Sequence, residues 1–433
     1  MKVVLINHSD SAGGAAVVSL RLVQALAEQG VDARMLVTHP SLPPSEQVGQ
    51  LGSPFANKCR FLAERLHVML HNGFNRRTLF KIDTCLFGAP MASHPWVKDA
   101  DVVVLAWVNQ ATASLHGIEQ LHRMGKPIVW VMHDMWNCTG VCHHAFDCEG
   151  YLNTCSACPL TGKRAHDLST ATQARKARLY ERVPIHFVAV SRWLEGVCRK
   201  SSIMKNADVR MIFNAFPVHD YHYERLSEPY PGVPANKTVV IMGARRLDED
   251  NKGFPEMVEA TQYIARHRPE LAARLHFILY GDMKNEALLH QVALPYTWVG
   301  VVNASELNRL YRHSDIVLST SLYENLPGTL IEGQASGCLP VTFGKGGQRD
   351  IVDHMHSGYI AEYKCAESVA DGLEWAIQHP VSRQWLHQEV ERKFSANVIA
   401  NQFIALFKEI KNSKSSIKHH ESCIMNYALC IMH

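Results

Sequence analysis

The chain has 433 residues, a formal net charge of +3, 47% hydrophobic residues and 20% charged residues. This length exceeds one ordinary core and suits two domains, and the composition excludes a disordered chain. A charge so close to neutral gives no global field for nucleic acid, so we expect no nucleic-acid partner. No apolar run approaches the roughly 20 residues of a membrane helix, and the first residues are typical of a strand rather than a signal peptide. We therefore expect a cytoplasmic protein.

The first half of the chain alternates between apolar strands and helices. Residues 2–8 form an apolar run, a glycine-containing turn follows, and a helical pattern then ends at Gly30. Further strands are predicted at 31–39, 101–108, 127–134, 185–191 and 209–214. Continuous apolar strands separated by helices predict a parallel sheet that is covered on both faces.

A linker is predicted at 215–237, where four prolines and little periodicity interrupt this alternation. A second alternating series follows, with strands predicted at 238–244, 275–281, 296–302, 315–321 and 339–343. Two doubly wound domains bind ligands at the carboxyl ends of their strands, in the cleft between them. We therefore expect an α/β protein in which two Rossmann-like domains face a cleft.

The expected domain boundaries follow from these patterns. Residues 1–214 would form the first domain and 238–384 the second. Residues 385–411 would form C-terminal helices that pack back toward the first domain. The tail at 412–433 is polar and then irregular, so we expect it to be disordered.

The segment 315–343 carries the strongest chemical signal. A strand is followed by a loop with Glu324 and by a helix with Glu332 inside it. Free backbone amides at a helix start can bind a diphosphate, and carboxylates suit sugar and ribose hydroxyls. From this spacing alone, the better interpretation would be two solvated surface glutamates, one in a loop and one on a helix. The candidate diphosphate site at this helix start is formed by Leu326, Pro327, Gly328 and Thr329.

Three other pieces could carry chemistry, although each has an ordinary structural explanation. Gly13 and Gly14 permit close approach of a phosphate to a helix start, or simply form a turn. Arg246 and Lys252 could neutralise a departing phosphate, or form surface ion pairs with the neighbouring acids. His133 ends a buried strand and could contact a sugar, or be a structural histidine.

Together these pieces resemble the GT-B retaining glycosyltransferases of the large group 1 type (family 4). Glu324 to Glu332 is similar to the E-x7-E signature of that family, and 10–15 resembles its glycine loop. Residues 243–253 resemble its phosphate-clamp motif, and 346–352 its G-G-x-x-E-x-V loop with Asp for Glu. The segment 133–136, with Trp107 and Asn109, is similar to enzymes of colanic acid and other bacterial surface polysaccharides. The hinge motif differs, since Asn214 is followed by Ala-Phe-Pro.

The resemblance implies a hexosyltransferase that retains the anomeric configuration. The donor would be a UDP- or GDP-sugar, and the acceptor a glycan or a polyprenyl-diphosphate-linked saccharide. It implies catalytic roles for His133 and Glu324, a ribose contact for Glu332, and catalysis that needs no metal or other cofactor. The alternatives are another GT-B activity, such as nucleotide-sugar epimerisation or phosphorolysis, and a zinc-containing binding module.

A loop at 135–160 is rich in cysteine, with five of the chain's 12 cysteines between 138 and 158. Cys155 and Cys158 have the spacing of half a tetrahedral zinc site, and zinc could supply folding energy to an irregular loop. The resemblance implies that Cys142 and Cys148 complete a structural site. Free thiols or a redox pair at Cys155 and Cys158 are the alternatives.

Residues 58–81 combine six basic residues with one acid and with apolar residues at helical spacing. Such a helix could bind anionic lipid headgroups and hold the protein on the inner face of the plasma membrane. It could equally be a helix that covers the domain and has a solvated basic face.

Overall fold

The computed structural model describes residues 1–43, 45–162 and 167–412. Its internal contacts divide the chain into two compact units. Unit 1 consists of Met1–Val190, Glu195–Phe216 and the chain from Ala396 onward. Unit 2 consists of Ser191–Leu194 and Pro217–Ser395. The predicted tail, except for its first residue, lies outside the described residues.

Unit 1 contains a seven-stranded sheet in the order β3-β2-β1-β4-β5-β6-β7, and every neighbouring pair is parallel. β4 and β5 are buried at every residue, as expected for strands with both faces covered. The strands are β1 (Lys2–Ser9), β2 (Asp32–His39), β3 (Val48–Gln50), β4 (Val102–Leu105), β5 (Ile128–Met132), β6 (Ile185–Ala189) and β7 (Asp208–Met211).

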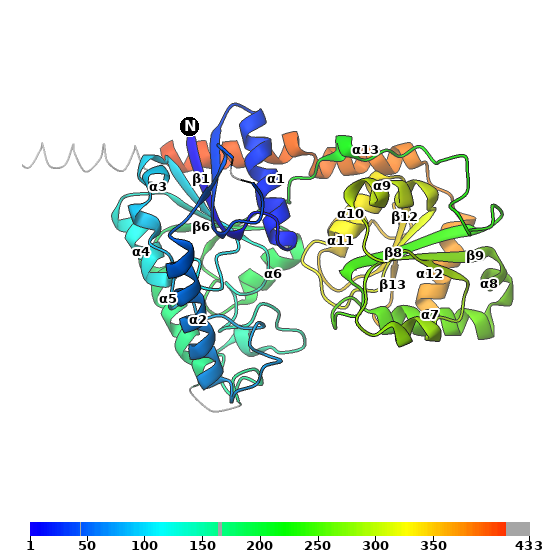
Figure 1. The fold of residues 1–433 in the computed structure, drawn as a ribbon, viewed down its shortest axis with the longest axis horizontal. Coiled ribbons are helices and arrows are strands. Elements are labelled where there is room, and N and C mark those ends of the chain that lie inside the picture. The colour runs from blue at the N-terminus through cyan, green and yellow to red at the C-terminus, as the bar shows by residue number, and fades with distance from the viewer. Residues whose placement is uncertain (44, 163–166, 413–433) are drawn as a thin grey trace, which may run out of the picture. The chain divides into compact units, whose positions relative to one another are not determined.

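Five named helices belong to this part of the chain, and a sixth, α6, begins in the segment Ser191–Leu194 of unit 2 and continues into unit 1 (Figure 1). They are α1 (Gly14–Glu28), α2 (Pro54–His71), α3 (Pro95–Asp99), α4 (Leu115–Arg123), α5 (Leu168–Arg182) and α6 (Arg192–Lys200), with 3₁₀ turns η1 (Met91–Ser93) and η2 (Gly150–Leu152). The starts of α2, α4 and α5 are fixed by the side chains of Ser53, Ser114 and Asp167, which accept backbone N–H groups.

Residues 396–412 are helical and return the chain to unit 1. This helix buries apolar side chains, including Ile399, Phe403 and Phe407. The Ala396 N–H donates to the carbonyl of Phe216 at 3.1 Å, and Arg210 forms an ion pair with Glu409 at 2.6 Å. The preceding helix, α13 (Arg383–Phe394), belongs to unit 2, so the predicted C-terminal segment 385–411 is divided between the two units.

Unit 2 contains a six-stranded parallel sheet in the order β10-β9-β8-β11-β12-β13. Figure 1 shows α9 and α10 on one face of this sheet and α7 and α12 on the other. The strands are β8 (Thr238–Arg246), β9 (Leu275–Asp282), β10 (Tyr296–Trp298), β11 (Ile316–Ser319), β12 (Leu339–Phe343) and β13 (Tyr359–Ala361). The remaining elements are η3 (Val218–Asp220), α7 (Phe254–His267), α8 (Pro269–Arg274), η4 (Glu286–Gln291), α9 (Ala304–His313), α10 (Gly328–Ala335), α11 (Gln348–Ile351) and α12 (Ala366–Gln378).

Both sheets have a point at which the strand order reverses. It lies between β1 and β4 in unit 1 and between β8 and β11 in unit 2. Doubly wound sheets bind ligands outside the carboxyl ends of the strands at such switch points. The prediction of two doubly wound parallel sheets is confirmed, and the loops after these strands are where a site is to be sought.

Candidate active site

The switch point of unit 2 brings together a lysine and a glutamate that sequence analysis singled out. Lys252 follows β8, Glu324 follows β11, and Lys252 Nζ lies 2.5 Å from Glu324 Oε1. Both side chains keep about a fifth of their surface exposed, at 23% and 20%. Burial lowers the pKa of Lys252, but the Glu324 carboxylate outweighs it and raises this pKa above the usual value. The pair therefore presents a charged ammonium beside a carboxylate that a ligand can still reach.

Backbone contacts hold this pair in place. Gly253 has φ 67°, and a Cβ there would lie 1.7 Å from the carbonyl oxygen of Thr320. The Thr320 hydroxyl donates to the Gly253 carbonyl at 2.7 Å, and the Leu322 N–H donates to the Asn251 carbonyl at 2.8 Å. The loop after β8 is thus hydrogen-bonded to the end of β11, and only glycine fits at their closest approach.

The loop after β12 packs against the backbone of Glu324. Gly346 has φ 140°, and a Cβ there would lie 2.1 Å from the Glu324 carbonyl oxygen, which also accepts the Gly347 N–H at 3.1 Å. Asp350 stands where the similar motif has a glutamate, and its side chain is buried. It accepts hydrogen bonds from the backbone N–H and from the guanidinium of Arg192. This loop therefore buttresses Glu324, and Asp350 itself holds the segment Ser191–Leu194 within unit 2.

The start of α10 is open to an anion. Pro327 occupies the N-cap position, no side chain caps the helix, and its first turn contains no acid. A Cβ at Gly328 would meet nothing within 4 Å. Uncapped amides and the positive end of the helix dipole favour a phosphate here. Of the predicted residues, Gly328 is exposed, Leu326 and Thr329 are half-buried, and Pro327 is buried.

Glu332 lies farther along α10 and is half-buried. The Tyr311 hydroxyl donates to its Oε2 at 3.4 Å, and the Tyr280 hydroxyl lies 2.9 Å from that of Tyr311. Burial, and then the nearby Glu332 carboxylate, raise the pKa of Tyr280. Tyr311 therefore contacts the Glu332 side chain from α9.

Arg246 is the half-buried member of the two adjacent arginines at the end of β8, whereas Arg245 is exposed. Its Nε lies 3.0 Å from Asp248 Oδ1, but the two atoms do not form a hydrogen bond. Because this ion pair is poorly aligned, Arg246 keeps donors for a ligand. Burial thus distinguishes Arg246 from its exposed neighbour Arg245.

In unit 1, the glycine loop ends at an open helix start. Gly13 is the N-cap of α1, which has no side-chain cap, and a Cβ at Gly13 or Gly14 would meet nothing within 4 Å. The Ser9 side chain stabilises this loop, because its hydroxyl accepts the N–H of Ala12 at 3.2 Å. Asp10 accepts the N–H of Ser41 at 2.9 Å. The backbone in front of α1 is thus accessible to a ligand.

His133 follows β5 at the carboxyl edge of the unit 1 sheet. Its Nε2 is buried and has no hydrogen-bond partner among the described residues. Burial lowers the pKa of His133 to about 4. The ring is therefore neutral near pH 7, with one nitrogen still to be satisfied.

Beside His133 lies a buried charged cluster that the sequence did not reveal. His143 donates from Nδ1 to Asp134 Oδ2 at 2.8 Å and from Nε2 to Asp83 Oδ2 at 2.9 Å. Burial lowers the pKa of His143, but the two aspartates outweigh burial and raise it to about 10. Asp83 also pairs with the buried Arg65, and Asp134 accepts the indole N–H of Trp107 at 2.8 Å. This cluster fixes the segment around His133.

The cysteine loop contains free thiols, among them Cys142, Cys148, Cys155 and Cys158. Burial raises the pKa of the Cys142 thiol to about 12 and also raises the pKa values of Cys155 and Cys158. Within the described ranges, no three His, Cys, Asp or Glu side chains are grouped so that they could hold a metal ion. The structural zinc therefore stays a prediction.

Comparison with known proteins supports the assignment made from these residues. Residues 236–379 match the family model of "Glycosyl transferases group 1". These residues are a group 1 glycosyl transferase domain. The domain contains every donor-site residue that was predicted in unit 2: Arg246, Lys252, Leu326, Pro327, Gly328, Thr329, Glu332 and Glu324.

Two relatives extend the likeness. A protein of Escherichia coli K12, WcaC, described provisionally as a colanic acid biosynthesis glycosyl transferase, is 25% identical over 387 residues, 85% of this chain and 89% of its own length. A glycosyltransferase of Methanocaldococcus jannaschii, MJ1607, which is not characterised, is 26% identical over 159 residues. That second match covers 34% of this chain and only 41% of the relative.

Solved structures share the fold over almost the whole chain. Sucrose-phosphate synthase of Thermosynechococcus elongatus has a TM-score of 0.64 at 16% identity and covers 95% of this chain and 100% of its own. HepE of Anabaena, solved in complex with UDP, has a TM-score of 0.60 at 14% identity and covers 94% and 100%. The chain therefore has the GT-B fold, which confirms what the resemblance of its sequence motifs implied.

Proposed function

We propose that the chain is a retaining glycosyltransferase that transfers a hexosyl group from a nucleotide sugar to a glycan or lipid-linked saccharide in polysaccharide synthesis. The Lys252–Glu324 pair carries this proposal, because it lies at the switch point of the group 1 glycosyl transferase domain. WcaC is described as a transferase of colanic acid biosynthesis, which supports a surface polysaccharide as the product. HepE was solved with UDP, which favours a UDP-sugar over a GDP-sugar as the donor.

In this proposal, different residues of unit 2 bind different parts of the donor. The amides at the start of α10 bind the diphosphate, while Lys252 and Arg246 neutralise the charge that develops as it departs. Glu324 accepts hydrogen bonds from the sugar hydroxyls, and Glu332 from the ribose. Two side-chain cations and a helix start supply the charge that a divalent metal would otherwise supply, so we propose that catalysis needs no metal.

From unit 1 we propose His133 as a residue that takes part in catalysis. Its neutral ring and unsatisfied Nε2 suit a hydrogen bond to a sugar hydroxyl, which would strengthen as charge develops on the sugar. Gly13 and Gly14 offer backbone amides at the open start of α1. The charged cluster around His143 acts by positioning, because it fixes the side chain of Asp134, the residue that follows His133 in the chain.

Ligand-dependent thermal stability tests the donor assignment. We expect UDP or one UDP-sugar to raise the melting temperature above that of GDP and its sugars, since a ligand at 100 times its Kd stabilises by about 2.7 kcal/mol. Nuclear magnetic resonance of the product formed from that donor then gives the configuration at the anomeric carbon. An inverted product would overturn the retaining mechanism, and a panel without any stabilising nucleotide would overturn the donor.

We also propose that unit 1 docks on an anionic membrane surface through α2. No helix in the described ranges is both long and apolar enough to cross a membrane. α2 nevertheless exposes Leu62, Leu66 and Leu70, at 55%, 59% and 56%, on one side of the helix. Phe55 and Phe74 near its two ends are exposed at 79% and 66%. Water-exposed leucines in a row are unusual for a monomer surface and fit the interfacial zone of a bilayer.

The charges around α2 complement anionic headgroups. Lys58, Arg76, Arg77 and Lys81 are exposed. The single acid of the segment, Glu64, is buried and accepts the N–H of Thr84 at 2.8 Å, so it does not offset them at the surface. Surface binding would place the enzyme on the inner face of the plasma membrane, near a polyprenyl-diphosphate-linked acceptor.

Flotation with vesicles tests this docking. Wild-type protein should float with vesicles that contain phosphatidylglycerol and should remain below with pure phosphatidylcholine. Replacement of Leu66 and Leu70 by Gln should abolish flotation, whereas the same change at the exposed Leu42 should leave it unchanged. Absence of flotation with either lipid would favour a helix that merely covers the domain, and flotation that is independent of these leucines would contradict docking through α2.

A further inference from the structure

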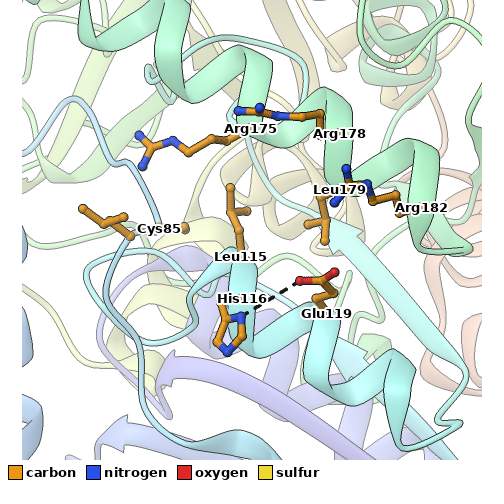
Figure 2. A pocket seen from close by; sticks show the side chains of 9 residues that line it. Cys85, Leu115, His116, Glu119, Arg175, Arg178, Leu179 and Arg182 are labelled. Atoms are coloured by element: carbon orange, nitrogen blue, oxygen red, sulfur yellow. Dashed lines mark ion pairs between the residues drawn. The ribbon is translucent and has the colours of Figure 1, made fainter.

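A pocket of about 330 Å³ lies between α4 and α5 in unit 1, away from every predicted site residue. Arg175, Arg178 and Arg182 line it from α5, as Figure 2 shows. Spacings of three and four residues place them along one side of the helix, spread over about 10 Å. The pocket is thus bordered by three guanidinium groups that follow one line.

Two of these arginines have no partner. Among the residues that the structure describes, Arg178 and Arg182 form neither a hydrogen bond nor an ion pair, and both are exposed. Arg175 donates only to neutral acceptors, the Ala171 carbonyl at 3.3 Å and the Thr172 hydroxyl at 3.0 Å. Burial lowers the pKa of Arg175, the carboxylate of Glu64 raises it, and the positive charge of Arg178 lowers it. The charges of Arg178 and Arg182 are therefore not paired with a carboxylate in the described part of the chain.

The opposite wall offers little negative charge. Glu119, on α4, lines the pocket, but its carboxylate already pairs with Arg123 at 3.1 Å and lies 4.0 Å from His116 Nδ1. Figure 2 shows Glu119 and His116 side by side on α4, across from the arginines. Leu115 and Leu179 line the space between the two helices. The pocket thus joins a positively charged border to an apolar floor.

We propose that this pocket is a second anion site of the protein, which binds a phosphate-bearing ligand through Arg178 and Arg182. A guanidinium donates two parallel hydrogen bonds, which match the oxygens of a phosphate. Three arginines over this length suit a diphosphate, or a phosphate joined to a small apolar group above Leu115 and Leu179. The volume lies at the lower end of the range for small-molecule pockets.

The phosphate could come from two sources, a soluble phosphorylated compound or a phospholipid headgroup. The second source is relevant because Arg175 lies near α2: burial, His71 and then Arg175 lower the pKa of His67 on that helix. Both sources share the same chemistry at the arginines. They differ in whether the phosphate is presented in solution or at a membrane.

Isothermal titration with inorganic pyrophosphate tests the site. Pyrophosphate can also bind at the proposed donor site, so the titration is made in Lys252→Ala protein. The titration then reports on the arginine pocket even if the donor assignment is wrong. Adding R178Q and R182Q should weaken binding at least about tenfold. Adding R199Q and K200Q, two exposed cations on α6, is the matched control and should change it less than about twofold. Equal losses in the two proteins, or no binding in either, would overturn the proposal.

A second measurement avoids substitutions. Phenylglyoxal should modify Arg178 and Arg182 in the wild-type protein, and pyrophosphate should protect both residues but not Arg199, as read by peptide mass spectrometry. Equal modification with and without pyrophosphate would overturn the site. Vesicles with phosphatidic acid form the second arm: protection by the vesicles as well as by pyrophosphate identifies a lipid headgroup as a source, and protection by pyrophosphate alone identifies a soluble ligand.

Discussion

Lys252 Nζ and Glu324 Oε1 lie 2.5 Å apart although 72 residues separate them in the chain. They meet because β8 and β11 are neighbours in the sheet and both loops leave its carboxyl edge. Both members keep about a fifth of their side-chain surface exposed, so a ligand can reach each charge. A nucleotide sugar that offers phosphate to the lysine and hydroxyls to the glutamate can therefore replace the pairing.

Removal of either member of this pair should abolish transfer and leave the fold intact. We expect K252A and E324Q each to lower kcat at least about 100-fold, because each removes a charge or acceptor that acts on the reacting group. The exposed Lys284 is the control, and K284A should retain activity. Initial rates with the identified donor give the comparison, with circular dichroism as the test of folding. Turnover within twofold of wild type in either variant would remove that residue from the site.

Substitution of Gly253 should disrupt the site through the backbone. In G253A, a Cβ would lie 1.7 Å from the Thr320 carbonyl oxygen at φ 67°, so the loop that carries Lys252 must shift. We expect a loss of about 2 kcal/mol or more in unfolding free energy and a weaker response to nucleotide. Gly232 separates the two effects, since it has φ 82° but nothing within 4 Å of its Cβ. G232A should cost about 1 kcal/mol and leave nucleotide binding unchanged; similar losses in both would contradict the clash.

The His143 cluster predicts a fall in stability at alkaline pH. The folded protein holds the His143 proton up to a pKa of about 10, whereas the unfolded chain releases it near 6.5. Stabilisation by this proton is therefore complete below about pH 6.5 and is lost as the pH rises toward 10, by up to about 1.4 kcal/mol per pH unit. Urea unfolding of wild type and H143Q at pH 6, 7.5 and 9 should show a difference that shrinks with pH. A constant difference, or a His143 ring that titrates below pH 7 by nuclear magnetic resonance, would refute the charged state.

Metal analysis decides between zinc and free thiols in the cysteine loop. If zinc binds, protein purified under reducing conditions should contain about one equivalent, because such sites bind tightly. C155S together with C158S should release it and lower the melting temperature. The control is C59S, since Cys59 is an exposed thiol on α2 outside the loop. Less than about half an equivalent in the wild type would favour the thiols.

The sequence was most informative where the chain forms continuous apolar runs. Strands such as β5 and β9 were predicted because both faces are covered and nearly every residue is apolar. β3 and β13 escaped prediction because each has only three residues, most of them half-buried, which is too short to show a period. In the site, Glu324 and Lys252 were found through a motif, and their contact follows from strand order, which a linear pattern does not contain.

The region around His133 shows the limit of sequence reasoning. Asp83 and His143 are 60 residues apart and have no diagnostic spacing, so only the fold reveals their contact. α2 misleads for a related reason. It buries Glu64 and Arg65 and exposes Leu62, Leu66 and Leu70, whereas an amphipathic pattern places the leucines inside. Specific partners for the buried charges, Thr84 and Asp83, reverse the usual arrangement.

The chain passes between its two units four times, at 190/191, 194/195, 216/217 and 395/396. A chimera in which everything from residue 217 onward came from another protein would therefore lose two sets of native contacts. It would separate Ser191 and Arg192 from Asn325 and Asp350, and would pair the helix at 396–412 with a foreign sheet. Recombination should preserve folding when the exchanged parts are 191–194 together with 217–395. The transferable module of this enzyme is thus discontinuous in its gene.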